Sequence, residues 1–165
     1  MNFKVKNRHR LKDKDSRQIL KEIKQNFESI NFKQNLIIEI GEVNGINFIF
    51  INGDPCFFYH GKKIIFTLNG LDKFTPINKF VIVDMGAVKF VTNGADVMAP
   101  GIVDADNEIV ENDQVWICDK LNRKPLAVGI ALISGEQMVK TNKGKAINVI
   151  HHVGDSIWNF VAKSL

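Results

Sequence analysis

The segment from residue 81 to residue 102 restricts the possible fold more than any other part of the sequence. It begins with Val81–Val83, a β-branched run that is typical of a buried strand. Asp84 comes next, where its carboxylate can cap a short helix over residues 85–93, and Gly94 supplies the backbone freedom that ends such a helix. A further apolar stretch and a Pro-Gly turn follow. The segment therefore predicts a strand, a helix and a second strand in close succession.

These same residues resemble a known family. Written from Asp84, the pattern is Asp-x-Gly-Ala-Val-Lys-Phe-Val-x-x-Gly-Ala-Asp-Val-Met-x-Pro-Gly-Ile. It is similar to the opening of the PUA domain, a small RNA-binding β-barrel. Further motifs with a family-like order lie at Gly135–Met138, Lys143–Ala146 and Asn148–Trp158. Together they resemble the malignant-T-cell-amplified-sequence family of translation factors and ligatin. The resemblance is strong from Val81 onward and weak before it.

The first half of the chain shows a helix pattern followed by strand patterns. Apolar residues recur at spacings of three and four, as on one face of an amphipathic helix, at Ile19, Leu20, Ile23, Phe27 and Ile30. Asp15 or Ser16 could cap this helix. Asn44-Gly45 lies between two apolar runs and is a strong hairpin signal. Four strands are expected, over residues 36–43, 46–51, 56–59 and 64–68, with a linker at residues 75–78.

Two neighbouring aromatic residues, Phe57 and Phe58, test this arrangement. Adjacent side chains on a strand point to opposite faces of the sheet. One ring is therefore expected beneath the helix, while the other lies either in a domain interface or in solvent, where it could stack on an unpaired base.

The second half is rich in short strands. The patterns predict strands over residues 113–118, 125–133, 145–152 and 157–160. Ser134 and Gln137 have the spacing of a capping box, which predicts a single-turn helix. Short strands with two small helices fit a closed barrel. The predicted fold class is therefore α+β, with an N-terminal helix-on-antiparallel-sheet domain over residues 1–76 and a C-terminal PUA β-barrel over residues 77–165.

Composition limits the class of protein. The chain has 165 residues, 45% hydrophobic and 24% charged, as in ordinary folded domains. It contains neither a run of about 18 apolar residues nor an N-terminal apolar signal core, so we expect a cytoplasmic protein that does not enter membranes. Cys56 and Cys118 stand far apart outside any Cys-x-x-Cys motif, which favours two reduced, buried thiols.

Positive charge is concentrated at the N-terminus. Residues 1–24 hold nine basic and three acidic residues, so nine minus three gives +6, against +4 for the whole chain. Clustered positive charge accelerates encounters with nucleic acid. A solvated helix face with no partner is the alternative. The predicted secondary basic patch comprises Arg8, Arg10, Arg17, Lys21, Lys24, Lys62 and Lys63.

Motifs for catalysis, cofactors and metals are missing from the sequence. There is no phosphate-binding loop, dinucleotide fingerprint or His-Glu-x-x-His motif. His151 and His152 are neighbours on an expected strand, so they point in opposite directions and cannot jointly hold one metal ion. No nucleophile, base and orienting group can be assembled from local spacing. We therefore expect a protein that is not an enzyme and that needs no cofactor or metal.

The resemblance also implies a binding surface. In the PUA family, RNA lies along the glycine loop after the first helix, the next strand and the last part of the barrel. The corresponding residues here are Lys89, Thr92, Asn93, Gly94, Ala95, Asp96, Val97, Met98, Pro100 and Gly101, together with Lys145 and His151. Chemically, Gly94 exposes backbone groups, Lys89 can meet a phosphate and Met98 can contact a base. The alternatives are a helix stop, a solvated lysine and a core methionine.

The same resemblance implies a role in translation. The translation-factor relatives suggest that the chain binds tRNA, at its acceptor end, or ribosomal RNA of the small subunit during initiation or recycling. Those relatives act beside an SUI1-type domain, so this chain would need a separate SUI1-domain partner or would have a smaller role. The length is consistent with an archaeal homologue. The alternatives are an RNA-targeting subunit of an RNA-modification or ribosome-biogenesis complex, and a scaffold that binds proteins.

Overall fold

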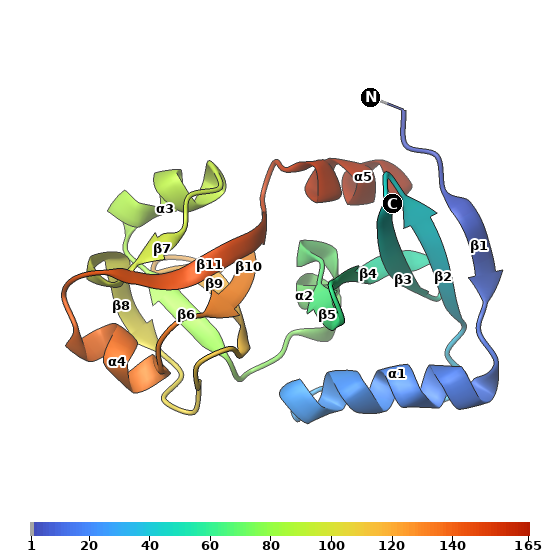
Figure 1. The fold of residues 1–165 in the computed structure, drawn as a ribbon, viewed down its shortest axis with the longest axis horizontal. Coiled ribbons are helices and arrows are strands. Elements are labelled where there is room, and N and C mark those ends of the chain that lie inside the picture. The colour runs from blue at the N-terminus through green and yellow to red at the C-terminus, as the bar shows by residue number, and fades with distance from the viewer. Residues whose placement is uncertain (1) are drawn as a thin grey trace.

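Two curved sheets, one from each half of the chain, form the framework of the molecule (Figure 1). The computed structural model describes residues 2–165. Within this range the first sheet is antiparallel, with strands in the order β1-β2-β3-β4-β5. These are β1 (Lys6–Arg10), β2 (Ile38–Val43), β3 (Ile46–Ile51), β4 (Asp54–His60) and β5 (Lys63–Phe66). The predicted hairpin is confirmed, because Asn44 and Gly45 both have positive φ, at 50° and 82°.

Helices cover both faces of the first sheet. Helix α1 (Asp13–Asn26) lies on one face and α5 (Ser156–Ser164) on the other (Figure 1). The rings of Phe27, just after α1, and Phe66 have centroids 4.9 Å apart. On the opposite face, the rings of Phe160 in α5 and Phe48 are 4.7 Å apart. The sheet is therefore the middle layer of a three-layer core.

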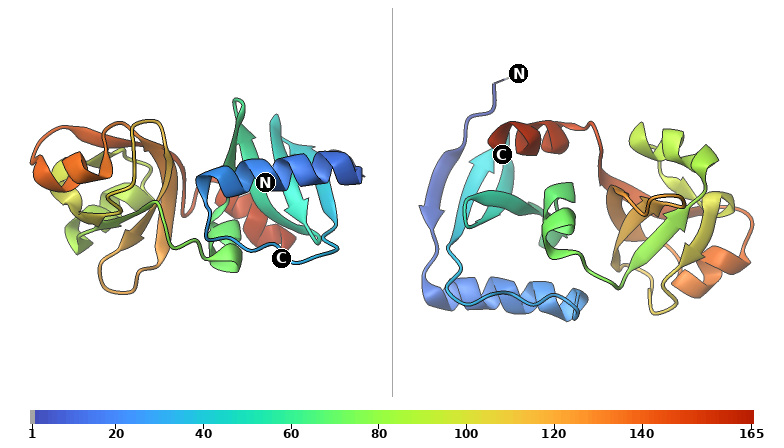
Figure 2. Two further views of the ribbon diagram at one scale, coloured as in Figure 1. Left: turned by 90° about the horizontal axis from the view of Figure 1, so that it is seen from below. Right: turned by 180° about the vertical axis from the view of Figure 1, so that it is seen from behind.

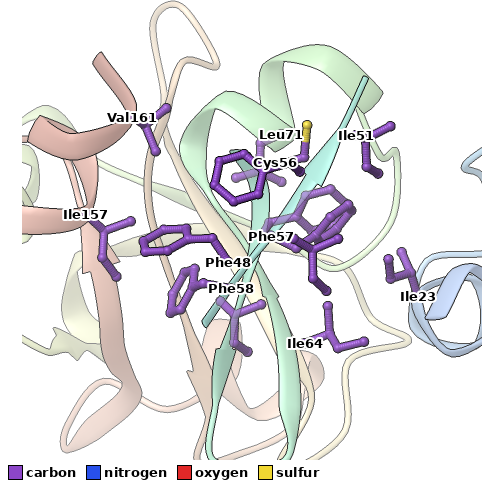
Figure 3. Packing of buried hydrophobic residues seen from close by; sticks show 14 of the residues in the cluster. Ile23, Phe48, Ile51, Cys56, Phe57, Phe58, Ile64, Leu71, Ile157 and Val161 are labelled. Atoms are coloured by element: carbon purple, nitrogen blue, oxygen red, sulfur yellow. The ribbon is translucent and has the colours of Figure 1, made fainter. Parts of the chain in front are cut away.

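Phe57 and Phe58 point to the two faces as expected. Figure 3 shows Phe57 on the side of Ile23 from α1, and Phe58 on the side of Ile157 from α5. Both phenylalanines are almost fully buried. The domain-interface interpretation is confirmed, and neither ring is available in solvent to stack on a base.

The second sheet curls into a near-barrel. Its order is β7-β11-β10-β9-β6-β8, with β6 and β9 parallel and the other neighbours antiparallel. The strands are β6 (Phe80–Val83), β7 (Val97–Met98), β8 (Ile102–Ala105), β9 (Gln114–Asp119), β10 (Pro125–Ala131) and β11 (Lys145–His152). The two edge strands, β7 and β8, are joined directly by the short 3-10 turn η1 (Ala99–Gly101), which brings the edges towards each other. The predicted α+β class is confirmed.

Three further helices belong to the described range, residues 2–165. They are α2 (Leu68–Phe74), α3 (Met85–Thr92) and α4 (Gly135–Lys140). Two of the three predicted caps are present: Asp84 accepts from the backbone N–H of Ala87 at 2.8 Å, and Ser134 forms the capping box with Gln137. No helix between residues 2 and 165 combines the length and the apolar character needed to cross a membrane.

Some predicted elements are wrong. Strand β1 and helix α2 were not predicted, and the expected strand over residues 64–68 ends at Phe66. The reason is that the Thr67 hydroxyl accepts from the N–H of Gly70 at 3.0 Å and caps α2 there. Helix α1 begins at Asp13, two residues before the earlier of the two predicted caps, and Lys12 occupies the capping position without a side-chain bond.

The expected strand over residues 157–160 is also wrong, because these residues belong to α5. The Asp155 carboxylate accepts from the N–H of Trp158 at 2.8 Å, which caps the helix. Ile157, Phe160 and Val161 then share one helix face, and they pack into the core of the first half. We keep a division of the chain at residues 76 and 77 as a proposal, with α5 packed against the first half.

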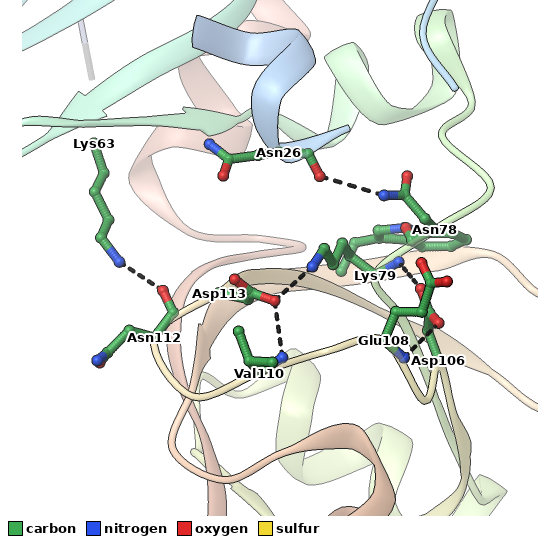
Figure 4. Close-up of polar contacts among 10 residues, drawn as sticks. Asn26, Lys63, Asn78, Lys79, Asp106, Glu108, Val110, Asn112 and Asp113 are labelled. Carbon is green, nitrogen blue, oxygen red and sulfur yellow. Dashed lines mark hydrogen bonds and ion pairs between the residues drawn. The ribbon is translucent and has the colours of Figure 1, made fainter. Parts of the chain in front are cut away.

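Polar contacts fix the two halves to each other. The side-chain amide of Gln114 bonds two backbone groups of β5, donating to the Ile64 carbonyl at 2.8 Å and accepting from the Phe66 N–H at 2.9 Å. The Lys63 ammonium donates to the Asn112 carbonyl at 2.7 Å. Figure 4 shows this contact beside the link between Asn78 and the carbonyl of Asn26. These bonds satisfy the outer edge of β5 and hold the halves in one orientation.

Low pH is expected to destabilise the protein by protonating the carboxylate of Asp155, which lies beside the contact between the halves. Burial raises the pKa of its carboxyl, but bonds from His151 and from backbone N–H groups lower it more, so the pKa is below its ordinary value. Stability from this ionised carboxylate is therefore complete above the unfolded pKa of about 3.9, and is lost as pH falls through the lower folded value. We expect Asp155→Asn to lower the melting temperature at pH 7 and to flatten the acid decline, measured by thermal unfolding from pH 7 to pH 3. Exposed Glu136→Gln is the control, and parallel curves for Asp155→Asn and wild type would contradict the assignment.

Candidate nucleic-acid interface

Helix α3, strand β7 and the turn η1 enclose a groove of about 380 Å³ on the second half. We call it the α3–β7 groove. The Asp84 cap fixes the start of α3 at one end of the groove. The groove is lined by Asp84, Gly86, Ala87, Phe90, Val91, Ala95, Asp96, Val97, Met98, Pro100 and Gly101. Its surface is mostly apolar, so it suits a flat or apolar part of a ligand better than a phosphate group.

Large apolar side chains at the groove are open to solvent. Phe90 is 63% exposed and Met98 is 48% exposed, and both line the groove. Met85, at the start of α3, is 45% exposed. Exposed apolar side chains gathered at one place indicate an interaction surface. An aromatic ring and a thioether are also groups on which nucleic-acid bases stack or rest.

Gly94 shapes the turn between α3 and β7. Its φ is +85°, which side chains rarely adopt, and its N–H donates to the Val91 carbonyl at 3.0 Å. A Cβ atom at Gly94 would lie 2.8 Å from Nε2 of His152. Glycine is therefore required both by the backbone and by the close approach of the histidine ring. The expected helix stop is present, and the turn leaves Gly94 exposed.

The histidine next to this turn is His152, and the prediction of a contact from His151 is wrong. His151 is fully buried and faces the first half, with its ring centroid 5.7 Å from that of Phe58. Its Nε2 accepts from the backbone N–H of Leu68 at 3.1 Å, so Nδ1 carries the hydrogen that bonds Asp155. Neighbouring residues on β11 alternate between faces, and this alternation assigns His151 to the interior and His152 to the groove side.

His152 was missed by the sequence prediction. It is half-buried, and its Nδ1 lies 2.9 Å from the Val153 carbonyl. A carbonyl only accepts, so Nδ1 donates and Nε2 is left facing the Gly94 turn.

The charged residues around the groove differ in whether they form ion pairs within the protein. Lys89 is exposed on α3 and makes no ion pair with any residue between 2 and 165. Lys145 pairs with Asp96 at 2.9 Å, and the same carboxylate accepts from the Val149 N–H at 2.8 Å. Burial raises the pKa of Asp96, but the bonds from Lys145 and Val149 and the charge of Lys145 together lower it by more, so its pKa lies below the usual range. Asp96 therefore ties the turn to β11.

The structure brings most of the predicted residues together. Ala95, Asp96, Met98, Pro100 and Gly101 line the groove, and Val97 lines it with a nearly buried side chain. Apart from the buried His151, the other predicted positions lie beside the groove or on the adjoining strand β11, at Lys89, Thr92, Asn93, Gly94 and Lys145. The Thr92 hydroxyl donates to the Val88 carbonyl of its own helix. Phe90 was missed because no role was assigned to it from the sequence. Gly86 and Ala87, which precede it on α3 and line the same groove, are small and leave space beside its ring, and this pattern is a usable signal.

Two members of the predicted secondary basic patch make contacts within the protein. The Arg8 guanidinium donates to both oxygens of Glu39, at 3.0 and 3.2 Å, and lies 4.0 Å from the centroid of the Phe50 ring. Lys63 is bonded to the Asn112 carbonyl across the junction. These two charges are held by the protein itself. The remaining members are exposed, at Arg10, Arg17, Lys21, Lys24 and Lys62.

Comparison with protein families separates the chain into two matched regions. Residues 79–153 match the PUA domain, and residues 7–74 match a domain of unknown function, DUF1947. The α3–β7 groove lies wholly in the first of these regions.

Related sequences match most of the chain. An uncharacterized protein of Methanocaldococcus jannaschii is 43% identical over 96% of this chain and 99% of its own length. Translation machinery-associated protein 20 of Saccharomyces cerevisiae is 34% identical, over 67% of this chain and 64% of its own length. Malignant T-cell-amplified sequence 1 of Rattus norvegicus is 32% identical, over 69% of this chain and 65% of its own length. The chain thus spans about two thirds of the length of these eukaryotic relatives.

Solved structures show the same fold. A hypothetical protein of Pyrococcus horikoshii has 36% identity and a TM-score of 0.81, over 93% of this chain and 99% of that one. A PUA-domain structure from Aeropyrum pernix, solved as a tartrate complex, has a TM-score of 0.87 over 97% of this chain and 92% of that one. It is 24% identical in sequence, so this likeness concerns the fold alone. The chain therefore belongs to the family of proteins that join a DUF1947 region to a PUA domain, with the malignant T-cell-amplified-sequence and translation machinery-associated proteins among its relatives.

Proposed function

We propose that this protein binds structured RNA through the α3–β7 groove and acts in translation without catalysing a reaction. The observation that carries the proposal is the groove itself, an apolar depression in a PUA domain with Phe90 and Met98 exposed at it. Bases stack on aromatic side chains whatever their identity. Phosphates are better placed outside, near Lys89, because the acidic groups that line the groove, Asp84 and Asp96, repel them.

The size of the groove favours an unpaired nucleotide. Its volume, about 380 Å³, is near the lower end of the range of roughly 300 to 1,000 Å³ for small-ligand sites. One or two nucleotides fit such a space, whereas a duplex has to remain at the rim. We therefore propose that an unpaired end, such as the acceptor end of a tRNA, or a looped-out nucleotide of ribosomal RNA enters the groove.

The translation role comes from the relatives. One of them is named as associated with the translation machinery. We propose that this chain binds tRNA or the small ribosomal subunit in the cytoplasm, in initiation or recycling. An SUI1-domain partner remains a prediction. Crosslinking in cells followed by sequencing of the attached RNA tests the assignment: recovery of tRNA ends or small-subunit RNA supports it, and recovery of neither contradicts it.

Charge reversal at Lys89 tests the phosphate contact. Three to five phosphate contacts give a slope of about −2 to −4 for log affinity against log salt. We expect Lys89→Glu to weaken tRNA binding several-fold and to reduce the magnitude of the slope by about 1, measured by fluorescence anisotropy. Lys4→Glu makes the same change in net charge at an exposed residue far from the groove and should have little effect. Affinity of the wild type that is independent of salt would overturn the proposal.

A further inference from the structure

Helix α1 carries a row of basic residues on its solvent face. Lys14, Arg17, Lys21 and Lys24 follow each other at intervals of three and four residues, so they share one side of the helix. At 1.5 Å per residue the row is about 15 Å long. We call it the α1 ridge. All four side chains are exposed, and within residues 2–165 none of them forms an ion pair.

One acidic residue of α1, Asp13, lies at the N-terminal end of this row, four residues before Arg17, and the others lie away from the row. Asp13 and Asp15 are both in the first turn, where their charges suit the positive end of the helix dipole. Glu22 is turned towards the β4–β5 hairpin, where it borders a depression with Lys62 and Lys63. Burial raises the pKa of Tyr59, and the charge of Glu22 raises it further, which places this carboxylate on the sheet side. Beyond the first turn, the ridge therefore presents charge of one sign.

The core holds the ridge in place. Ile19, Ile23 and Phe27, on the opposite side of the helix, are almost fully buried against the first sheet. The apolar stripe of α1 is thus already covered by protein. A helix that binds a membrane surface needs its apolar face free to enter the lipid, so this arrangement does not suit a membrane. A phosphate backbone needs only fixed cations.

The ridge and the α3–β7 groove lie on opposite sides of the molecule. Figure 1 shows α1 and α3 at diagonally opposite corners, and Figure 2 shows the same separation from two other directions. The bonds of Gln114 and His151 across the junction keep this separation fixed. A nucleotide in the groove therefore leaves the ridge free for another stretch of RNA.

We propose that the α1 ridge is a second RNA-binding surface, which takes the phosphate backbone of a duplex, so that the protein bridges two RNA segments. Duplex binding by the ridge does not depend on the groove, whereas the bridging of two RNA segments rests on the function proposed for the groove. The duplex is recognised by charge and shape, without reading its sequence.

The test is a comparison of two double variants on a blunt-ended RNA duplex of about 20 base pairs. Lys14→Glu with Lys21→Glu alters the ridge. Lys4→Glu with Lys6→Glu makes the same change in net charge at exposed residues near the N-terminus, away from α1. At low salt we expect the ridge variant to bind at least about 10-fold more weakly, with the salt slope reduced in magnitude by about 2. The control variant should change affinity by less than about threefold.

Two outcomes would overturn the proposal. Equal losses in both double variants would show that net charge alone matters, and unchanged duplex binding in the ridge variant would show that α1 is not involved. Circular dichroism checks that the helices remain. Bridging is measured as energy transfer between a labelled duplex and a labelled single-stranded RNA. A groove variant, Phe90→Ala, should lose the single strand and keep the duplex, which separates failure of the ridge from failure of the groove.

Discussion

Phe90→Ala is expected to weaken the binding of a short single-stranded RNA by about 5- to 150-fold. Stacking of one base on an aromatic ring contributes about 1 to 3 kcal/mol, and each 1.4 kcal/mol is a factor of ten in affinity. The ring of Phe90 is 63% exposed, so its removal takes little from the core, and the melting temperature should stay close to that of the wild type. Anisotropy titration with a labelled RNA and a thermal melt are the two measurements.

Ile77→Ala is the matched control for this experiment. Ile77 is 77% exposed and lies in the connection between the halves, outside the α3–β7 groove. It loses a comparable exposed apolar side chain, and RNA affinity should not change. If Phe90→Ala binds RNA as the wild type does, the groove is not the binding site for bases.

Gly70→Ala should cause a large loss of stability, about 3 kcal/mol, through overpacking. A Cβ atom at Gly70 would lie 2.1 Å from the carbonyl oxygen of Cys56, which is backbone and cannot turn aside. That carbonyl also accepts from the Thr67 N–H at 2.9 Å. Moving α2 to make room would stretch this bond and the bond from the Leu68 N–H to His151. The expected fall in melting temperature is about 6 to 12 °C.

Gly86→Ala separates this effect from the general effect of replacing a helical glycine. Gly86 is in α3, where a Cβ atom would lie 3.3 Å from the carboxylate oxygen Oδ1 of Asp84, the end of a flexible side chain. Alanine is a better helix former than glycine by about 1 kcal/mol. This variant should melt at or slightly above the wild-type temperature. If the Gly70→Ala variant had the same melting temperature as the Gly86→Ala variant, this would show that α2 can move away from β4 at little cost.

Three elements defined by local chemistry could be predicted from the sequence. Asp84, Ser134 and the Asn44-Gly45 pair each act on backbone groups within a few residues, and each is found doing so. The pattern around them contains all the information needed, because the partner of each group is a near neighbour in the chain.

Elements defined by distant partners could not be predicted in the same way. The pattern of the residues from Ile157 to Val161 fits both a strand and a helix. The contact with the aromatic face of the first sheet decides between them, and part of that face lies more than a hundred residues earlier in the sequence. His151 could be assigned to either face of β11 from the sequence alone. Its burial depends on Leu68 and Asp155, and only Asp155 is close by in sequence.

The candidate site was predicted in its backbone and less well in its side chains. The turn at Gly94 and the groove residues from Ala95 to Gly101 follow from the family pattern, and their contact with RNA stays a prediction. Phe90 and His152 were missed because exposure of an apolar residue, and the choice between two adjacent histidines, depend on how α3 and β11 pack.

The position of α5 on the first sheet also affects how the protein is made. Phe48 and Phe58 belong to strands that leave the ribosome early, but their cover, Ile157 and Phe160, is translated only after the whole second sheet. About 100 residues separate Phe58 from Ile157, so at synthesis rates of about 5 to 20 residues per second the aromatic face of the nascent chain lacks its covering helix for about 5 to 20 seconds. Vectorial synthesis thus leaves the first half unfinished until the second has emerged.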